Sequence, residues 1–375
     1  MKTGVLEFIR SIDDGGAETL VKDYALLTNK EKFEVYVLGQ YQIDHAANTK
    51  TLRASGIPLS FVYPGHGFFC KAFNAVFGKW YVSHTIKKMV QKHHIQTIHA
   101  HMTVLRYLVP ISDFLKEKGV RILYTCHSLP ERYFGGSQAE EGEAAKYLIE
   151  HNGLRLIGLH EEMVQELNER FSVNNSVFIR NGIDFRRYRD IQETKWEIRK
   201  DLGVPENAFV LGHVGRFHPL KNHKFLVEVF QQLVQRQENA FLLMVGAGDE
   251  MADIKAKLEE YGLQEKFLIL SNRPDVHRIL KTMDVFVFPS LAEGLGIALI
   301  EAQVSGLRCV VSDMVPEEAF LTSFVVPLSV EDPIEKWCDA IEDDQLFGSY
   351  QGDINKYDMN QEIKRLENLY MDIEG

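Results

Sequence analysis

Residues 284–302 read Asp284-Val-Phe-Val-Phe288-Pro-Ser-Leu-Ala-Glu293-Gly-Leu-Gly-Ile-Ala-Leu-Ile-Glu301-Ala, and this stretch decides the fold. The apolar run that ends at Phe288 predicts a buried strand, and residues 297–305 predict an amphipathic helix that carries Glu301. Glu293 lies between them in a loop that contains two glycines. The segment therefore predicts a strand–loop–helix unit with one carboxylate just past the strand and a second just inside the helix.

The carboxylates and the new helix together favour one kind of ligand. Gly294 and Gly296 let the backbone approach a ligand closely, and the first N–H groups of a helix can donate hydrogen bonds to phosphate. Carboxylates accept hydrogen bonds from hydroxyl groups. A ligand with both sugar hydroxyls and a phosphate would use both features. The alternative interpretation is an ordinary strand–loop–helix unit with two solvated glutamates.

Short apolar segments alternate with helical ones along nearly the whole chain. This alternation predicts an α/β protein with parallel sheets covered by helices on both faces. Helices are expected over residues 17–28 and 357–371. The expected strands are residues 5–9, 33–38, 59–63, 97–100, 121–125 and 154–159, followed by residues 209–214, 241–245, 267–270, 284–288 and 308–311.

The dipeptide Asn181-Gly182 is a turn signal that separates the two series of strands. It predicts two Rossmann-like domains whose parallel sheets face a central cleft. The first comprises residues 1–180 and the second residues 181–356; the family resemblance given below implies that the C-terminal helix, within residues 357–375, joins the first. Since ligands bind at the carboxyl ends of strands in such sheets, the cleft is the expected site.

Charge and cysteine usage exclude several classes of protein. The net charge of −11 argues against nucleic acid as the main partner. Residues 1–180 hold 21 Lys and Arg against 19 Asp and Glu (21 − 19 = +2), whereas residues 181–375 hold 21 against 34 (21 − 34 = −13). The four cysteines form no CxxC pair, which favours reduced thiols in a cytosolic protein. We expect neither a signal peptide nor a membrane span.

Two cations follow the strand expected at residues 209–214. Arg216 and Lys221 on one strand-end loop could neutralise a diphosphate, although two solvated surface cations would look the same. The next strand ends in Val245-Gly-Ala-Gly248, which begins like a dinucleotide fingerprint. Met251 stands where the third glycine of that fingerprint belongs, so nicotinamide binding is not expected.

The N-terminal half carries weaker signals. Gly15-Gly16 precedes a helix and could cradle a phosphate, or could be a plain turn. His99, His101 and His127 end strands, but their spacing gives no metal-ligand motif. No DxD triplet occurs in the sequence. We interpret His127 as a residue of the cleft and expect neither a metal nor any other cofactor.

An aromatic segment lies in a window that contains no acidic residue, residues 45–112. Aromatic side chains interleaved with lysine suit an anionic membrane surface, and the alternative is a core helix with solvated lysines. The window predicts peripheral docking on the inner face of the cell membrane. The residues expected on this face are Lys71, Lys79, Trp80, Lys87 and Lys88.

With these motifs in order, the chain resembles glycosyltransferase family 4, of the GT-B fold, over nearly its whole length. Within that family it looks most like bacterial enzymes of exopolysaccharide and capsule assembly. The motifs that carry the resemblance are Gly215-Arg216-Phe then Lys221-Asn222, Gly246-Ala-Gly248, Asn272-Arg273-Pro-Asp275, and the stretch from Phe288 to Ala302, with Gly15-Gly16, His99-Ala-His101, His127 and Asn181-Gly-Ile-Asp184 in the first half.

The resemblance implies a role for each matched residue. Arg216 and Lys221 would bind the donor diphosphate, Glu293 and His127 would contact the donor sugar, and Glu301 would hold the ribose. The remaining donor contacts implied are Gly16, Asn272, Arg273, Gly294, Leu295 and Gly296. The family implies sugar transfer with retention and without metal.

The implied function is transfer of a sugar, most simply from a UDP-sugar, to a saccharide or lipid-linked acceptor in exopolysaccharide or capsule assembly. Two alternatives remain open. One is a sugar-nucleotide epimerase or hydrolase on the same fold; the other is a non-catalytic sugar-nucleotide sensor or assembly partner. The first would share the donor site without a lipid-facing surface, and the second need not retain every donor contact.

Overall fold

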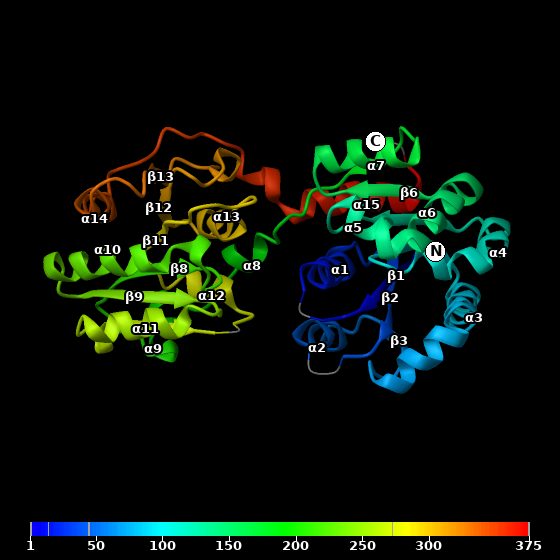
Figure 1. The fold of residues 1–375 in the computed structure, drawn as a ribbon, viewed down its shortest axis with the longest axis horizontal. Coiled ribbons are helices and arrows are strands. Elements are labelled where there is room, and N and C mark those ends of the chain that lie inside the picture. Colours follow the sequence, from blue (N-terminus) through cyan, green and yellow to red (C-terminus); the bar gives the residue numbers. More distant parts are fainter. Residues whose placement is uncertain (1, 14, 44–45, 272, 374–375) are drawn as a thin grey trace. The chain divides into compact units, whose positions relative to one another are not determined.

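Two parallel β-sheets, each in its own unit, organise the chain in a computed structural model that describes residues 2–13, 15–43, 46–271 and 273–373 (Figure 1). The first unit comprises Met1–Gly182 and Met359–Gly375, and the second comprises Ile183–Asp358. The sequence had placed the divisions at residues 180/181 and 356/357. The chain thus leaves the first unit once and returns to it through its last helix.

The first unit contains a seven-stranded sheet in the order β3-β2-β1-β4-β5-β6-β7. Its strands are β1 (Thr3–Ser11), β2 (Phe33–Tyr41), β3 (Leu59–Tyr63), β4 (Ile95–His101), β5 (Arg121–Thr125), β6 (Arg155–Gly158) and β7 (Val177–Phe178). Its helices are α1 (Gly16–Leu27), α2 (Ala47–Ala54), α3 (Phe68–His93), α4 (Ser112–Glu117), α5 (Pro130–Phe134), α6 (Ala139–Asn152), α7 (Glu161–Phe171) and α15 (Met359–Met371).

The second unit contains a six-stranded sheet in the order β10-β9-β8-β11-β12-β13. Its strands are β8 (Phe209–Val214), β9 (Ala240–Val245), β10 (Phe267–Leu270), β11 (Val285–Phe288), β12 (Arg308–Ser312) and β13 (Val325–Leu328). Its helices are α8 (Arg186–Arg189), α9 (Lys195–Leu202), α10 (His223–Arg236), α11 (Met251–Glu260), α12 (Val276–Leu280), α13 (Ile297–Val304) and α14 (Ile334–Glu342).

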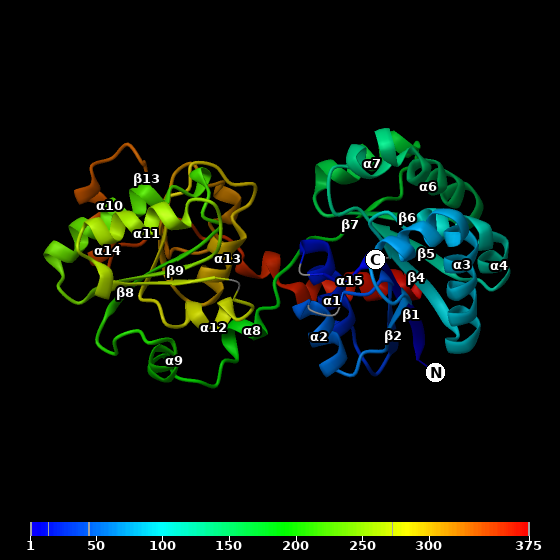
Figure 2. The same ribbon diagram turned by 60° about the horizontal axis from the view of Figure 1, so that its bottom comes forward.

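Alternate side chains of the central strand β11 enter different cores. In β11, Phe286 and Phe288 belong to one buried cluster and Val285 and Val287 to the other. A strand buried on both faces reads as a continuous apolar run, which is why residues 284–288 were identified from the sequence. In the first unit α15 packs on β1 and α1, and both ribbon views show it there (Figures 1 and 2).

The predicted α/β architecture with two parallel-sheet domains is confirmed, since every strand pairing in the described chain is parallel. Eleven strands were expected, and each is present with an end shifted by at most a few residues. The sequence missed β7 and β13. β7 is two residues long, and β13 contains Pro327, which an edge strand tolerates because one side of its backbone needs no partner.

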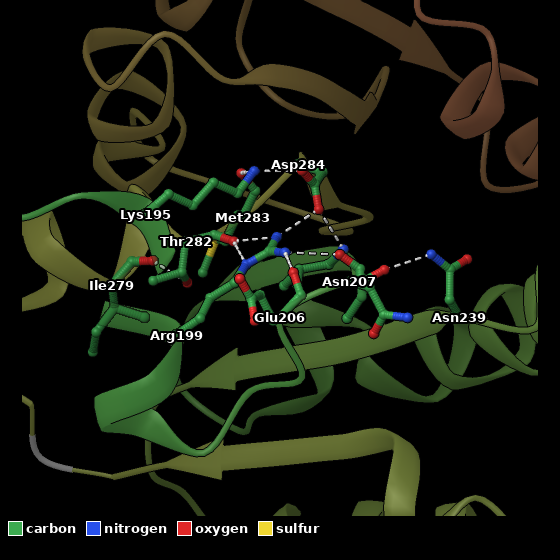
Figure 3. Close-up of polar contacts among 11 residues, drawn as sticks. Lys195, Arg199, Glu206, Asn207, Asn239, Ile279, Thr282, Met283 and Asp284 are labelled. Atoms are coloured by element: carbon green, nitrogen blue, oxygen red, sulfur yellow. Dashed lines mark hydrogen bonds and ion pairs between the residues drawn. The ribbon is translucent and has the colours of Figure 1, made fainter. Parts of the chain in front are cut away.

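A buried arginine ties α9 to the start of β11. All five N–H donors of Arg199 are used: on the carbonyl oxygens of Thr282 (twice), Glu206 and Ala208, and on Asp284 Oδ2 at 2.7 Å (Figure 3). Asp284 Oδ2 also accepts a hydrogen bond from the backbone N–H of Val210 at 2.7 Å. The network therefore joins α9, β8 and β11 at the amino end of the sheet.

We expect Arg199→Met to lower the free energy of unfolding by roughly 3 kcal/mol, because it leaves the buried carbonyl groups of Thr282 and Ala208 without this donor and removes one of the two cations on Asp284. Urea unfolding followed by tryptophan fluorescence measures the loss. Arg236 forms an exposed pair with Asp339 and serves as the matched control. Arg236→Met should leave the unfolding midpoint near that of the wild type, and an equal loss in both variants would contradict the argument.

Candidate active site

The strand order of the second sheet reverses between β8 and β11. These strands are neighbours, although β9 follows β8 in the chain and pairs on its other side. The loops after β8 and β11 therefore open side by side, at the point where α/β sheets bind ligands. The backbone N–H of Leu291 donates to the carbonyl of Leu220 at 2.8 Å and joins the two loops.

Lys221 and Glu293 meet between these loops. Lys221 Nζ donates a hydrogen bond to Glu293 Oε1 and lies 5.2 Å from the centroid of the Phe288 ring. The side chains are 22% and 9% exposed, respectively. The two ions are thus largely withdrawn from water. In such a site a charge interacts more strongly with a ligand than it does at an open surface.

Arg216 lies beside this pair and is exposed. Among the residues that the structure describes, it has no acidic partner. It lines a hollow of about 390 Å³, which is large enough for part of a small ligand. The other lining residues are His218, Leu220, Lys221, Ala292, Glu293 and Gly294. The hollow thus presents an uncompensated guanidinium together with one internal ion pair.

The glycines that begin like a dinucleotide fingerprint have a packing role. Their loop lies against the loop that carries Arg216: Phe217 N–H donates to the carbonyl of Ala247 at 3.0 Å. A Cβ atom at Gly246 would overlap the carbonyl oxygen of Gly215, and one at Gly248 would overlap that of Phe217. These glycines allow the two loops to pack closely.

The loop after β11 turns into α13 through Gly296, whose φ of 80° favours glycine. Gly294 is exposed, and a Cβ atom there would meet open space. Leu295 is half-buried and packs against the core cluster. The first N–H groups of α13 have no helical acceptor because they precede the first full turn. This is the geometry that the sequence predicted for the segment.

Glu301 projects from α13 and accepts a hydrogen bond from the Tyr188 hydroxyl, with an O–O distance of 2.5 Å to Oε1. Burial raises the pKa of Glu301, and the Tyr188 hydrogen bond and the nearby Arg187 offset that rise only in part. Tyr188 comes from the four-residue helix α8, and no motif in the sequence distinguished it. Oε2 of Glu301 has no hydrogen-bond partner among the described residues and could accept a second hydroxyl.

The segment expected to lie against a base is only partly described, because Asn272 lies outside the described residues. Arg273 Nε and NH2 donate to the two oxygens of Asp275 at 2.7 and 2.6 Å. This bidentate pair holds the side chain of Arg273 along its own loop, and the Arg273 hydrogen bond lowers the pKa of Asp275. The Arg273 side chain is 29% exposed, so a base could still stack on its guanidinium plane.

In the first unit the expected residues lie at the carboxyl edge of the sheet. Gly16 begins α1, is exposed, and would place a Cβ atom in open space. His127 follows β5, and its Nε2 lies 3.0 Å from Nδ1 of His101 at the end of β4. β4 is the neighbour of β1 at the point where this sheet also reverses its strand order. Gly16 and His127 thus follow strands on either side of β4.

The cluster at this edge differs from the three histidines considered from the sequence. Glu7 in β1 faces His99 across the strand pair, and the ligand atoms of Glu7, His99 and His101 lie within 4.8 Å of one another. Glu7 came from a strand interior, where a carboxylate is uncommon, and sequence reasoning did not connect it with the histidines. The expectation that no metal binds stays a prediction.

The N-terminal half of α3 is the expected membrane face. One stripe of the helix exposes large apolar side chains, with Phe69 86% and Trp80 65% exposed; its other members are Phe73, Val76 and Phe77. Lys71 and Lys88 are exposed, whereas Lys87 lies over the Phe114 ring at 4.7 Å and is half-buried.

Lys79 departs from the expected free lysine. Its Nζ pairs with Glu140 at 2.6 Å, and Arg106 pairs with the same carboxylate at 3.3 Å. Residues 45–112 therefore contain no acidic residue, but the fold places an acidic side chain next to them, because α6 brings Glu140 beside Lys79 and Arg106. In the described chain no helix has both the length and the apolar character needed to cross a bilayer.

Residues 14–187 match the family described as Glycosyltransferase Family 4, and residues 194–343 match the family described as Glycosyl transferases group 1. The chain is 26% identical to the protein named as glycosyltransferase EpsF of Bacillus subtilis (strain 168), over 98% of this chain and 96% of that one. It is 24% identical to the capsular polysaccharide biosynthesis glycosyltransferase CapH of Staphylococcus aureus, over 98% of each chain.

A further relative covers part of the chain. It is the UDP-Gal:alpha-D-GlcNAc-diphosphoundecaprenol alpha-1,3-galactosyltransferase of Escherichia coli, which is 28% identical over 58% of this chain and 60% of its own length. Among solved structures, Anabaena Alr3699/HepE in complex with UDP and glucose superposes with a TM-score of 0.65 over 99% of both chains, at 18% identity. The GT-B fold that the sequence resemblance implied is thereby confirmed.

We expect Glu301→Gln to raise the free energy of unfolding at neutral pH in the absence of ligand. The amide is uncharged and still accepts the Tyr188 hydrogen bond, so the cost of burying an ion disappears. Because the folded-state pKa of Glu301 is raised above its ordinary value of 4.5, the wild type loses stability as the pH rises through that raised value. The advantage of the variant should therefore vanish below the ordinary value.

Urea unfolding of both proteins from acid to neutral pH measures this difference. Glu317 is an exposed glutamate that also lies within hydrogen-bond distance of a tyrosine hydroxyl, Tyr350 at 3.4 Å, so Glu317→Gln is the matched control. The control should change stability little at any pH. If Glu301→Gln were no more stable than the wild type at neutral pH, the burial argument would be wrong.

Proposed function

The chain belongs to the glycosyltransferases of family 4 and group 1, and from that premise we propose that it is a retaining, metal-independent enzyme. It transfers a sugar from a nucleotide-sugar, most simply a UDP-sugar, to a saccharide or lipid-linked acceptor in exopolysaccharide or capsule assembly. Support for the donor comes from the solved structure with UDP and glucose, and support for a lipid-linked acceptor comes from the name of the Escherichia coli relative.

The observation that carries the proposal is the combination of charges at the β8–β11 reversal. Arg216 and Lys221 offer two cations to a diphosphate, and Glu293 offers a carboxylate to hydroxyl groups within the same hollow. An anion that draws Lys221 toward its phosphate would release Glu293 Oε1 for a sugar hydroxyl. Loading the site would thus replace one internal ion pair by two contacts to the donor.

The nucleoside end of the donor would lie toward α13. Glu301 would accept hydrogen bonds from the ribose through Oε2 while Tyr188 occupies Oε1. The N–H groups of Gly294, Leu295 and Gly296 would donate to phosphate or sugar oxygens. Arg273 and Asn272 would lie against the base. The donor contacts that the family resemblance implies for Gly16 and His127, in the first unit, stay predictions.

In the reaction we propose, the acceptor oxygen attacks the anomeric carbon from the face that the diphosphate leaves. The carbon–oxygen bond to the phosphate breaks, the new glycosidic bond forms, and the departing phosphate oxygen takes the acceptor proton. The protein then contributes mainly position and charge: Arg216 and Lys221 stabilise the negative charge that develops on the leaving diphosphate. With two cations supplied by side chains and no DxD triplet in the sequence, the diphosphate needs no divalent ion.

The acceptor would reach the enzyme at a membrane. We propose that the exposed stripe of α3 docks on the anionic inner face of the cell membrane, which gives a cytoplasmic protein a peripheral location. The stripe exposes Phe69, Val76 and Trp80 by more than half, and the same helix carries the exposed cations of Lys71 and Lys88. Aromatic side chains enter the headgroup region while lysines meet anionic lipid, and each favourable cation adds about 1 kcal/mol.

Product analysis distinguishes transfer from the alternatives. Nucleotide-sugars with different bases are screened by thermal shift, since a bound donor stabilises the folded chain. The donor that binds is then incubated with and without a lipid-linked saccharide, and the products are analysed by mass spectrometry and NMR. Transfer with the donor's anomeric configuration supports the proposal. An isomerised or hydrolysed donor, formed without acceptor, would instead identify an epimerase or hydrolase.

Arg216→Ala and Lys221→Ala should each lower the turnover number on the order of 100-fold, because each removes charge stabilisation that is needed as the diphosphate departs. Lys224 is an exposed lysine on α10 that pairs with Glu250 at 3.7 Å, and Lys224→Ala is the control. It should keep wild-type turnover. Turnover within about threefold of the wild type in both site variants would exclude the proposed role of the cations.

Vesicle sedimentation tests the docking surface. The wild type should sediment with vesicles that contain anionic lipid and much less with zwitterionic ones, because both apolar burial and lysine attraction contribute. Phe69→Ser with Trp80→Ser should lower the partition coefficient on the order of 100-fold, since each aromatic side chain contributes about 1.5–3 kcal/mol when buried and 1.4 kcal/mol is about tenfold. Trp196, 51% exposed in the second unit, gives the control variant Trp196→Ser. Absence of sedimentation even with lipid-linked acceptor present would exclude docking.

A further inference from the structure

A buried polar network in the first unit connects the last helix to His127. Glu7, His99, His101 and Tyr370 are each 0% exposed. Glu7 Oε1 lies 2.6 Å from the Tyr370 hydroxyl, and Glu7 Oε2 lies 2.7 Å from His101 Nε2. His101 Nδ1 in turn lies 3.0 Å from His127 Nε2. Four side chains from β1, β4, α15 and the loop after β5 thus form one continuous chain of contacts.

The carboxylate of Glu7 sets the direction of the hydrogen bonds. Burial alone would raise its pKa, but His99 and His101 outweigh burial and hold the pKa of Glu7 well below its ordinary value. An ionised carboxylate can only accept. The Tyr370 hydroxyl therefore donates to Oε1, and His101 donates its Nε2 proton to Oε2.

The other branch agrees with this direction. Since the Tyr370 hydroxyl gives its proton to Glu7, its oxygen accepts from His99 Nδ1 at 2.9 Å. His99 Nε2 is then free to accept from the Thr125 hydroxyl at 2.7 Å. Every group has a partner of the opposite kind, and both branches end on Glu7. A proton on His99 Nδ1 also suits the 3.3 Å approach of that nitrogen to Glu7 Oε2.

His101 passes this direction on to His127. Burial lowers the pKa of His101 to about 4, with the neighbouring His99 adding to the shift and Glu7 partly offsetting it. His101 is therefore neutral at neutral pH and carries one proton, which Glu7 holds on Nε2. Its Nδ1 is bare and accepts. Burial also lowers the pKa of His127, so that side chain is neutral as well and its single proton lies on Nε2.

We propose that Glu7 and His101 are positioning residues that fix His127 with its proton on Nε2 and its Nδ1 bare. Nδ1 of His127 has no partner among the described residues. A bare imidazole nitrogen accepts a hydrogen bond, so His127 would recognise a hydroxyl as its donor rather than a carbonyl or phosphate oxygen as its acceptor. That this hydroxyl belongs to the donor sugar rests on the function proposed above.

Tyr370 contributes from α15, which reaches the sheet only because the chain returns to the first unit. Its hydroxyl occupies the second oxygen of Glu7, and its ring packs against Phe33 at 5.9 Å between centroids. The side chain limits the carboxylate to one orientation, with Oε2 toward His101. Through Glu7 and His101, α15 thereby influences His127 without contacting it.

A metal ion is the competing reading of the same atoms. Glu7, His99 and His101 could supply three ligand atoms within 4.8 Å. However, Oε2 of Glu7 already accepts from His101 Nε2, and His99 Nδ1 already meets the Tyr370 hydroxyl. A bound ion would displace the protons of these hydrogen bonds and separate their partners. The complete set of hydrogen bonds favours the network without an ion.

The ring nitrogens of His127 can be observed directly, without a variant and without activity. Protein labelled with 15N-histidine gives distinct NMR signals for protonated and bare imidazole nitrogens. We expect a protonated Nε2 and a bare Nδ1 at neutral pH, with His127 assigned from the loss of signals in His127→Ala. A proton on Nδ1 of His127 in the wild type would overturn the proposal, and so would a stoichiometric metal in the purified protein.

Glu7→Gln tests the cause. Its side-chain amide offers one oxygen to two donors. We expect that oxygen to keep the Tyr370 hydroxyl, which lies 2.6 Å from Oε1 in the wild type, so that the amide nitrogen faces His101. Nε2 of His101 would then accept, its proton would move to Nδ1, and His127 would be forced to carry its proton on Nδ1. We expect the two His127 nitrogens to change roles, with the proton on Nδ1 and Nε2 bare. We also expect kcat to fall roughly 10- to 100-fold, the range for a mispaired buried hydrogen bond. Affinity for free nucleotide, which the second unit would bind, should be unchanged.

Tyr370→Phe is the matched control, because it removes a buried hydroxyl of the same network but leaves the carboxylate ionised. It should lose stability as Glu7→Gln does, while the His127 signals stay as in the wild type. If the His127 proton moved from Nε2 to Nδ1 in both variants, or in neither, the proposed role of Glu7 would be overturned. If the chain transferred no sugar, the proposed function would fail, but the NMR result would still decide the position of the proton.

Discussion

The pairing of β8 with β11 is the constraint on which the donor site depends. β9 follows β8 in the chain but lies on the side of β8 away from β11. The loops after β8 and β11, which are distant in sequence, therefore open next to each other at the same edge of the sheet. Only this neighbourhood allows Lys221, on the first loop, to meet Glu293, on the second. Arg216 joins them because the glycines after β9 let its loop pack closely. The charges of the site are therefore a result of strand order.

The first unit repeats the constraint with different chemistry. β1 and β4 are neighbours at its own reversal, and their register places Glu7 opposite His99. Here the reversal carries the hydrogen-bonded network of Glu7, His101 and Tyr370. One sheet presents cations with room beside them; the other presents a histidine whose hydrogen bonds are already committed on one side.

Sequence reasoning identified what local pattern encodes. The run at residues 284–288 is apolar because both faces of β11 are buried, and Glu293 and Glu301 follow at positions that strand and helix periods determine. Partners from distant segments left no such pattern. Tyr188 reaches Glu301 from a four-residue helix, Glu140 reaches Lys79 from α6, and Glu7 reaches His101 across the sheet. Their contacts exist only after the strands have been ordered.

The two ends of β11 show how the unit tolerates charge in its site. At the amino end, Asp284 is held by Arg199 and by backbone N–H, with every donor of the guanidinium satisfied (Figure 3). At the carboxyl end, Glu293 lies beside a cation and the half-buried Glu301 beside a hydroxyl, and a ligand could displace either partner. A buried ion without full compensation lowers stability. Because Asp284 fixes the start of β11, the loop that follows the strand begins from a fixed position. That loop and the next helix can therefore hold the charged side chains of Glu293 and Glu301.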